Sequence, residues 1–228
     1  MKQLALILAP PPAAALDNFF PGRNAELLDL LENMVSGRTG ERSVYLWGEA
    51  GSGRSHLLRA TISGLSAAGL ECLHVSKGDP VPAMVGSLRA VAVDDVDSLD
   101  SLNQRAFFSL YNQLRERSGI VLAAGNAAPA QLRLRPELVT RLGWGLVYQV
   151  QALTDEEKAL ALKVHAQARS FDLPHGVIEY LLRHHSRDLQ SLMGILDALD
   201  RLSLETKRPI TLPLVKQLLR AETGQERH

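Results

Sequence analysis

The feature that most constrains this chain is an octapeptide at residues 48–55, Gly48-Glu49-Ala50-Gly51-Ser52-Gly53-Arg54-Ser55. It fits the phosphate-binding pattern G-x-x-x-x-G-K-[ST] at all fixed positions except one, where Arg54 replaces lysine. Glycines let successive backbone N–H groups turn toward phosphate oxygens, and a helix that follows adds its positive N-terminal end. The pattern therefore predicts a strand, a phosphate-binding loop and a helix in that order.

Because arginine stands at position 54 where the pattern has lysine, we expect nucleotide binding and ATP turnover to be affected differently. The guanidinium keeps the positive charge, but it replaces a compact ammonium with a broad planar fork. We expect ADP or ATP to bind with Mg²⁺, and we expect weak or no intrinsic ATPase activity. The residues predicted to hold the nucleotide are Gly48, Gly51, Ser52, Gly53, Arg54 and Ser55, with the Ser55 hydroxyl on Mg²⁺.

The flanks of the octapeptide fit this interpretation. Residues 43–47 are apolar and β-prone, which is typical of a buried strand, and a helical pattern opens at His56. The alternative is a Gly/Ser turn that binds nothing, and the eight residues alone leave it open.

A second motif strengthens the nucleotide hypothesis. The apolar run at residues 91–93 ends in Asp94 and Asp95, and carboxyl ends of parallel strands face the ligand crevice. Asp94 is predicted to reach the Mg²⁺ shell, and Asp95 to orient or deprotonate an attacking water. The alternative is a strand that runs into an acidic solvated turn. The Asp94-Asp95 pair follows both the phosphate loop and an apolar strand, and this position favours the functional interpretation.

Strands and helices alternate along the first two thirds of the chain. The predicted strands are 43–47, 73–75, 90–93, 119–123 and 146–150, and the predicted helices are 24–35, one after the loop, and 104–117. This order favours a parallel sheet covered on both faces. After residue 153 the pattern is helical throughout, over about 154–170, 174–185, 188–205 and 211–221. We therefore predict an α/β nucleotide-binding domain over 17–152 and a helical lid domain over 153–228, preceded by a Pro/Ala-rich tether within 1–16.

Composition limits the partners. The chain has 25 basic and 25 acidic residues, so no global field favours non-specific DNA binding. The single cysteine fits a reducing cytoplasm. The apolar run at the N-terminus stops at Pro10, too short for a secretory signal, and no stretch reaches the length of a membrane span. We expect a cytoplasmic protein that acts on DNA only through other proteins.

Three further polar residues occupy positions of interest. Asn126 follows the fourth strand, where its amide could face a γ-phosphate, although polar residues are common at strand ends. Arg141 precedes the last strand, where it could point at a neighbour's phosphate or be an ordinary surface arginine. Arg187 begins a lid helix, and it could contact nucleotide or an exposed carboxylate.

These motifs together resemble the AAA+ ATPases related to the replication initiator DnaA, and most of all the Hda family of DnaA regulators. The likeness extends over about residues 1–220, and it includes the Gly-Arg-Ser-His-Leu-Leu run at 53–58 and the lid sequence around 199–201. It implies an AAA+ fold, an arginine finger at Arg141 that acts in trans, and sensor positions at Asn126 and Arg187. The relatives usually carry an acid at the position of Asn126.

The resemblance also implies two partners. Residues 3–8 are similar to the family's peptide for the DNA polymerase sliding clamp, which assigns clamp contacts to Gln3, Leu4, Leu6, Ile7 and Leu8. At the position of Ile7 the family favours a proline or an aromatic residue. The second partner is DnaA, and a homo-oligomer is compatible with the same likeness.

The leading hypothesis is a regulator that binds the DNA-loaded clamp and stimulates hydrolysis of the ATP held by DnaA, which prevents re-initiation. One alternative is a helicase-loader or clamp-loader ATPase. Another is an adaptor whose function does not depend on nucleotide.

Overall fold

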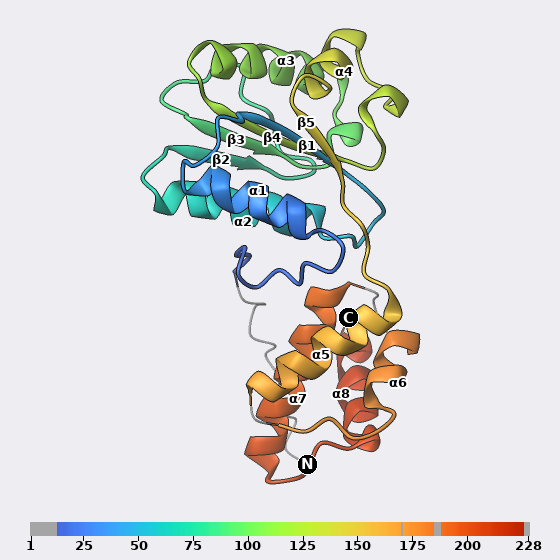
Figure 1. The fold of residues 1–228 in the computed structure, drawn as a ribbon. Helices are drawn as coiled ribbons and strands as arrows, with labels where there is room; N and C mark the ends of the chain where they lie inside the picture. The colour runs from blue at the N-terminus through green and yellow to red at the C-terminus, as the bar shows by residue number, and fades with distance from the viewer. Residues whose placement is uncertain (1–12, 170, 185–187, 226–228) are drawn as a thin grey trace. The chain divides into compact units, whose positions relative to one another are not determined.

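The computed structural model describes residues 13–169, 171–184 and 188–225. The described part divides into two compact units, residues 13–152 and the residues from 153 onward. The first unit is an α/β domain and the second is helical (Figure 1). The predicted fold class is confirmed.

The first unit is built on a parallel sheet of five strands within its described residues, in the order β2-β3-β4-β1-β5. The strands are β1 (Ser43–Trp47), β2 (Cys72–Val75), β3 (Ala90–Val93), β4 (Ile120–Gly125) and β5 (Leu146–Gln149). Every residue of β3 and β4 is buried, as expected for central strands covered on both faces. Because all strands run the same way, their carboxyl ends share one edge of the sheet and their amino ends share the other.

Helices cover both faces of this sheet (Figure 1). Helices α1 (Ala25–Val35) and α2 (Arg54–Ala67) lie on one face, while α3 (Ser101–Glu116) and α4 (Pro136–Leu142) lie on the other. Each face has its own apolar core. The first core includes Leu31, Met34, Leu46, Leu57 and Leu122, and the second includes Tyr45, Val91, Phe107, Leu114 and Leu138.

Two helices of the first unit clearly differ from the sequence-based expectation. Helix α3 begins at Ser101, before the expected start at residue 104, because the Asp100 carboxylate accepts a hydrogen bond from the backbone N–H of Asn103. Helix α4 has only seven residues and was not predicted. It begins at Pro136, where a fixed φ and a missing N–H suit the first turn of a helix.

The second unit contains α5 (Asp155–Ala168), α6 (Val177–His184), α7 (Leu189–Thr206) and α8 (Leu212–Gln225). The predicted capping box is present at α5, where Thr154 and Glu157 exchange side-chain to backbone hydrogen bonds. Leucines from α5, α6, α7 and α8 form one apolar core. Among the described residues, none of the helices combines the length and the apolar character that a membrane span needs.

Candidate nucleotide site and candidate arginine finger

The loop at 48–53 connects the carboxyl end of β1 to α2, as the sequence predicted. Gly51 and Gly53 have φ values of 79° and 101°, in the left-handed region that favours glycine. Gly53 is the N-cap of α2 and offers no side chain to the first N–H groups of the helix. Those donors are therefore available to an anion at the end of a 14-residue helix.

Close packing fixes the loop on both sides. A Cβ at Gly48 would lie 2.5 Å from the carbonyl oxygen of Val150, and a Cβ at Gly53 would lie 2.7 Å from the ring of Phe19. Phe19 also packs against the His56 imidazole, at a centroid distance of 5.7 Å. Sequence reasoning missed Phe19, because no local pattern places residue 19 beside residue 53.

Two buried polar groups in the loop have atoms without a protein partner among the described residues. The Ser52 hydroxyl oxygen and Nη1 of Arg54 are both buried, and neither makes a hydrogen bond. A buried unsatisfied polar group costs about 1–3 kcal/mol, so proteins rarely leave one without a reason. A phosphate oxygen in the loop could accept from both groups. Together with the glycine conformations, these atoms fit a bound nucleotide.

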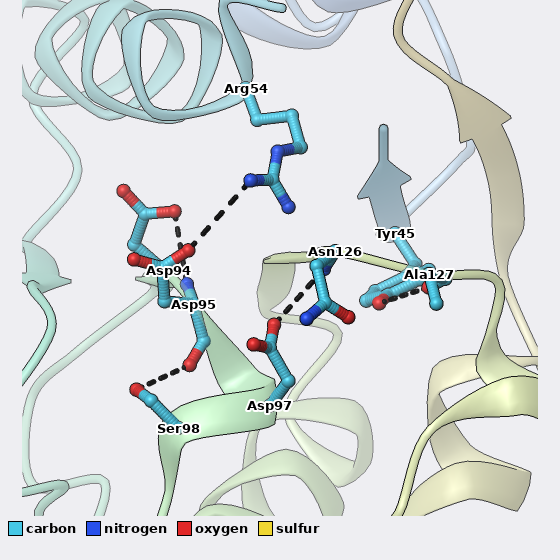
Figure 2. Close-up of polar contacts among 8 residues, drawn as sticks. All are labelled: Tyr45, Arg54, Asp94, Asp95, Asp97, Ser98, Asn126 and Ala127. Atoms are coloured by element: carbon cyan, nitrogen blue, oxygen red, sulfur yellow. Dashed lines mark hydrogen bonds and ion pairs between the residues drawn. The ribbon is translucent and has the colours of Figure 1, made fainter. Parts of the chain in front are cut away.

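The paired acids lie at the same edge of the sheet, after β3. Asp94 is 8% exposed, and its Oδ1 accepts a hydrogen bond from the backbone N–H of Asp95. Asp95 has a φ of 45°, an uncommon conformation for a residue with a side chain. This turn directs the Asp95 carboxylate toward Arg54, and Nη2 of Arg54 lies 3.9 Å from Oδ1 of Asp95 (Figure 2).

Asn126 follows β4 and completes the group at this edge (Figure 2). Its backbone N–H donates to the Asp97 carboxylate at 3.0 Å. Nearby, the Tyr45 hydroxyl donates to the carbonyl of Ala127 at 2.8 Å. Burial, and secondly the charge of Asp97, raises the pKa of Tyr45, so the hydroxyl remains a donor at neutral pH. The contact made by Asp97 was not anticipated from the sequence.

The chemistry that these residues can supply is nucleotide binding with Mg²⁺. Ser55 and Asp94 would hold the ion through oxygen atoms, which Mg²⁺ prefers, and nucleotide phosphates would complete its shell. The ion would neutralise phosphate charge when bound. Asp95 is the candidate for positioning water, but the structure already pairs its carboxylate with Arg54.

Arg141 lies at the opposite edge of the sheet. It is in the last turn of α4, just before β5 begins at Leu146, and so it sits by the amino ends of the strands. Its Nε donates to Oδ1 of Asn112 on α3 at 2.8 Å. Its guanidinium carbon lies 3.6 Å from the ring centroid of Trp144 and 5.2 Å from that of Phe108.

These contacts hold Arg141 in a defined position at a partly exposed site. The side chain is half-buried, and Trp144 beside it is 47% exposed. Among the described residues, Nε of Arg141 makes a hydrogen bond, whereas its terminal amino groups make no hydrogen bond or ion pair. Sequence reasoning singled out Arg141 but missed Asn112, which has no local signal.

The remaining site residues named from the sequence lie outside the described residues. They are Arg187 and the N-terminal residues Gln3, Leu4, Leu6, Ile7 and Leu8.

Comparison with known proteins agrees with this architecture. Residues 155–219 match the family model for the lid domain of Hda. Domain III of the replication initiation protein DnaA from Thermotoga maritima has a TM-score of 0.74 and 18% identity, covering 93% of this chain and 98% of that one.

Two other solved structures have similar folds. AMPPCP-bound DnaA from Aquifex aeolicus has a TM-score of 0.68 and 21% identity, covering 85% of this chain and 68% of that chain. A RuvB variant from Thermotoga maritima has a TM-score of 0.62 and 18% identity, covering 93% of this chain and 72% of that chain. Residues 155–219 therefore match the Hda lid-domain family, and the chain shares the fold of DnaA domain III and of RuvB.

Proposed function

We propose that the chain is a negative regulator of replication initiation that stimulates hydrolysis of the ATP bound by DnaA. In this proposal Arg141 enters the nucleotide site of DnaA as a trans arginine finger. DnaA becomes ADP-bound and inactive, and re-initiation is prevented. The family of the lid domain and the DnaA-like fold support a DnaA-related partner.

The observation that carries the proposal is the position of Arg141 relative to the chain's own phosphate loop. The loop follows the carboxyl end of β1, whereas Arg141 lies by the amino ends of the strands. At a rise of roughly 3.3 Å per residue, the five residues of β1 separate the two edges by roughly 16 Å. A phosphate contact by Arg141 must therefore be made with another molecule.

The geometry of Arg141 supports this role. Asn112 and Trp144 restrict the guanidinium, while its terminal amino groups keep their donors for an acceptor outside the chain. A guanidinium that is already oriented loses less side-chain entropy when it binds phosphate. Where such a residue is supplied in trans, it accelerates phosphoryl transfer by roughly 10³- to 10⁵-fold.

In the same proposal the chain's own nucleotide is ADP, and it maintains the conformation competent for the partner. Residues 3–8 tie the protein to the DNA-loaded sliding clamp. That assignment depends on the sequence alone. Arg54 engages Asp95, which supports weak intrinsic turnover and disfavours the loader-type ATPase. The unpartnered buried atoms of Ser52 and Arg54 disfavour an adaptor that works without nucleotide.

The test mixes the chain with ATP-loaded DnaA and with clamp loaded on DNA, and it follows phosphate release in a single turnover. We expect stimulation by the wild-type chain and its loss in Arg141→Ala. Arg105→Ala is the matched control, because Arg105 is an exposed arginine in the N-terminal half of α3. Full stimulation by Arg141→Ala would refute the role in trans. Rapid phosphate release by the isolated chain would favour the loader-type ATPase.

A further inference from the structure

A pocket of about 500 Å³ opens at the amino edge of the sheet. Ser43, the first residue of β1, lines it together with Gly119 and Gly145, which immediately precede β4 and β5. Its wall includes Trp144 and the guanidinium-bearing residues Arg42 and Arg115. The pocket therefore lies at the edge opposite the chain's own phosphate loop, beside the position of Arg141.

The guanidinium groups of Arg115 and Arg141 both lie over the indole ring of Trp144. The guanidinium carbon of Arg115 lies 4.2 Å from the indole centroid, and that of Arg141 lies 3.6 Å from it. The two cations are thus at most about 8 Å apart, where like charges repel appreciably near a protein surface. Within the described part of the chain, neither guanidinium forms a salt bridge, and Glu41 in the pocket wall pairs with neither.

An uncompensated cluster of arginines on a half-exposed tryptophan is typical of a protein interface. Trp and Arg are enriched among the residues that contribute most to binding, and charged residues in such places need an opposite charge from the partner. Stacking uses the planar faces of the guanidinium and leaves its N–H groups at the edges for a carboxylate. The terminal N–H groups of the two stacked guanidinium groups are therefore available to a carboxylate from outside the chain.

We propose that this pocket, defined by Arg42, Ser43, Arg115 and Trp144, is a docking site for a protruding carboxylate side chain of the DnaA surface. This inference rests on the proposed function, because it assigns a second contact to the same encounter. The occupant of a recess must protrude. A triphosphate held in the partner's phosphate loop is itself recessed, whereas an aspartate or glutamate on a helix or loop projects from its surface.

Arg115 and Arg141 then have separable tasks. Arg141 acts on the reaction, and Arg115 contributes to affinity. The difference can be measured, because Arg115 is exposed and its replacement removes no buried packing. We expect Arg115→Glu to weaken binding of ATP-loaded DnaA by roughly tenfold or more. Arg115→Ala, which places no anion beside Arg141, should also weaken binding but leave the hydrolysis rate at saturating DnaA unchanged. The difference in affinity between Arg115→Glu and the wild-type chain should become smaller as the salt concentration is raised.

The experiment measures the affinity of the full chain for ATP-loaded and for ADP-loaded DnaA, with single-turnover hydrolysis on the same samples. Its variants are Arg115→Glu, Arg115→Ala, Arg141→Ala and the control Arg105→Glu, which makes the same charge change as Arg115→Glu elsewhere on α3. An affinity of Arg115→Glu equal to that of Arg105→Glu would overturn the docking site.

The remaining outcomes separate the two proposals. If Arg115→Glu weakened binding only to ATP-loaded DnaA, its ligand would be the γ-phosphate and the carboxylate assignment would be wrong. If Arg141→Ala retained full stimulation while Arg115→Glu lost affinity, the finger would be refuted and the docking site supported. A wild-type chain that binds neither form of DnaA would overturn both.

Discussion

Replacing Arg54 with alanine tests whether this arginine side chain contributes to nucleotide binding or to the stability of the protein. The Arg54 side chain is 11% exposed, and its Nη1 is buried without a hydrogen-bond partner. Its contact with Asp95 spans 3.9 Å, and Asp95 is 31% exposed. The two roles predict opposite effects on affinity and stability.

The structure sets the expected magnitudes. A buried unsatisfied donor costs about 1–3 kcal/mol, whereas a long and partly exposed ion pair contributes less than about 1 kcal/mol. Removing the side chain should therefore leave the free energy of unfolding of the nucleotide-free protein unchanged or slightly higher. A charge-assisted hydrogen bond to phosphate is worth about 1.5–3 kcal/mol. Its loss should raise the Kd for ADP by roughly 10- to 100-fold.

Two measurements on each variant check this prediction. Titration with a fluorescent ADP analogue in the presence of Mg²⁺ gives the Kd, and urea unfolding without nucleotide gives the stability. Arg59→Ala is the matched control, since Arg59 is an exposed arginine of the same helix, and its Nε only donates to the carbonyl of Ser55. An unchanged Kd in Arg54→Ala, or a loss of several kcal/mol of stability without nucleotide, would refute the reasoning.

Two further variants probe the two edges of the sheet. In Asn112→Ala, Arg141 loses its hydrogen bond at Nε, and we expect stimulation of DnaA to fall roughly tenfold in single-turnover phosphate release, with overall stability little affected. In Asp95→Asn, we expect any intrinsic turnover to disappear while stimulation of DnaA persists, because Asp95 lies at the chain's own loop. Steady-state phosphate release with and without DnaA distinguishes these effects, and a loss of stimulation in Asp95→Asn would contradict the separation of the two edges.

The parts of the fold that could be predicted are those encoded locally. The apolar runs of the five strands, the glycine loop after β1 and the capping box at Thr154 each depend on a few adjacent residues. The short helix α4 was missed because seven residues give too little periodicity to detect.

Contacts between distant segments could not be predicted in the same way. Asn24 exchanges hydrogen bonds with the backbone of Gln151, and Asn112 accepts one from Arg141. Each pairing depends on where the folded sheet brings two segments, and neither partner carries a local pattern. The sequence could therefore propose a finger at Arg141, but it could not name the residue that orients it.

The separation of the two edges also constrains how the chain's own nucleotide can influence its partner. An ADP bound at the proposed site on the carboxyl edge could not contact Arg141, so any influence would have to pass through the sheet and its helices. Strand β1 is the direct link, because the phosphate loop follows its last residue and Ser43 at its start lines the pocket beside Trp144. If ADP maintains the competent conformation, Arg54→Ala should stimulate DnaA poorly at low ADP and recover at saturating ADP. An adaptor independent of nucleotide would show no such recovery. Recovery would therefore tie the arginine in the loop to hydrolysis at a site that it never touches.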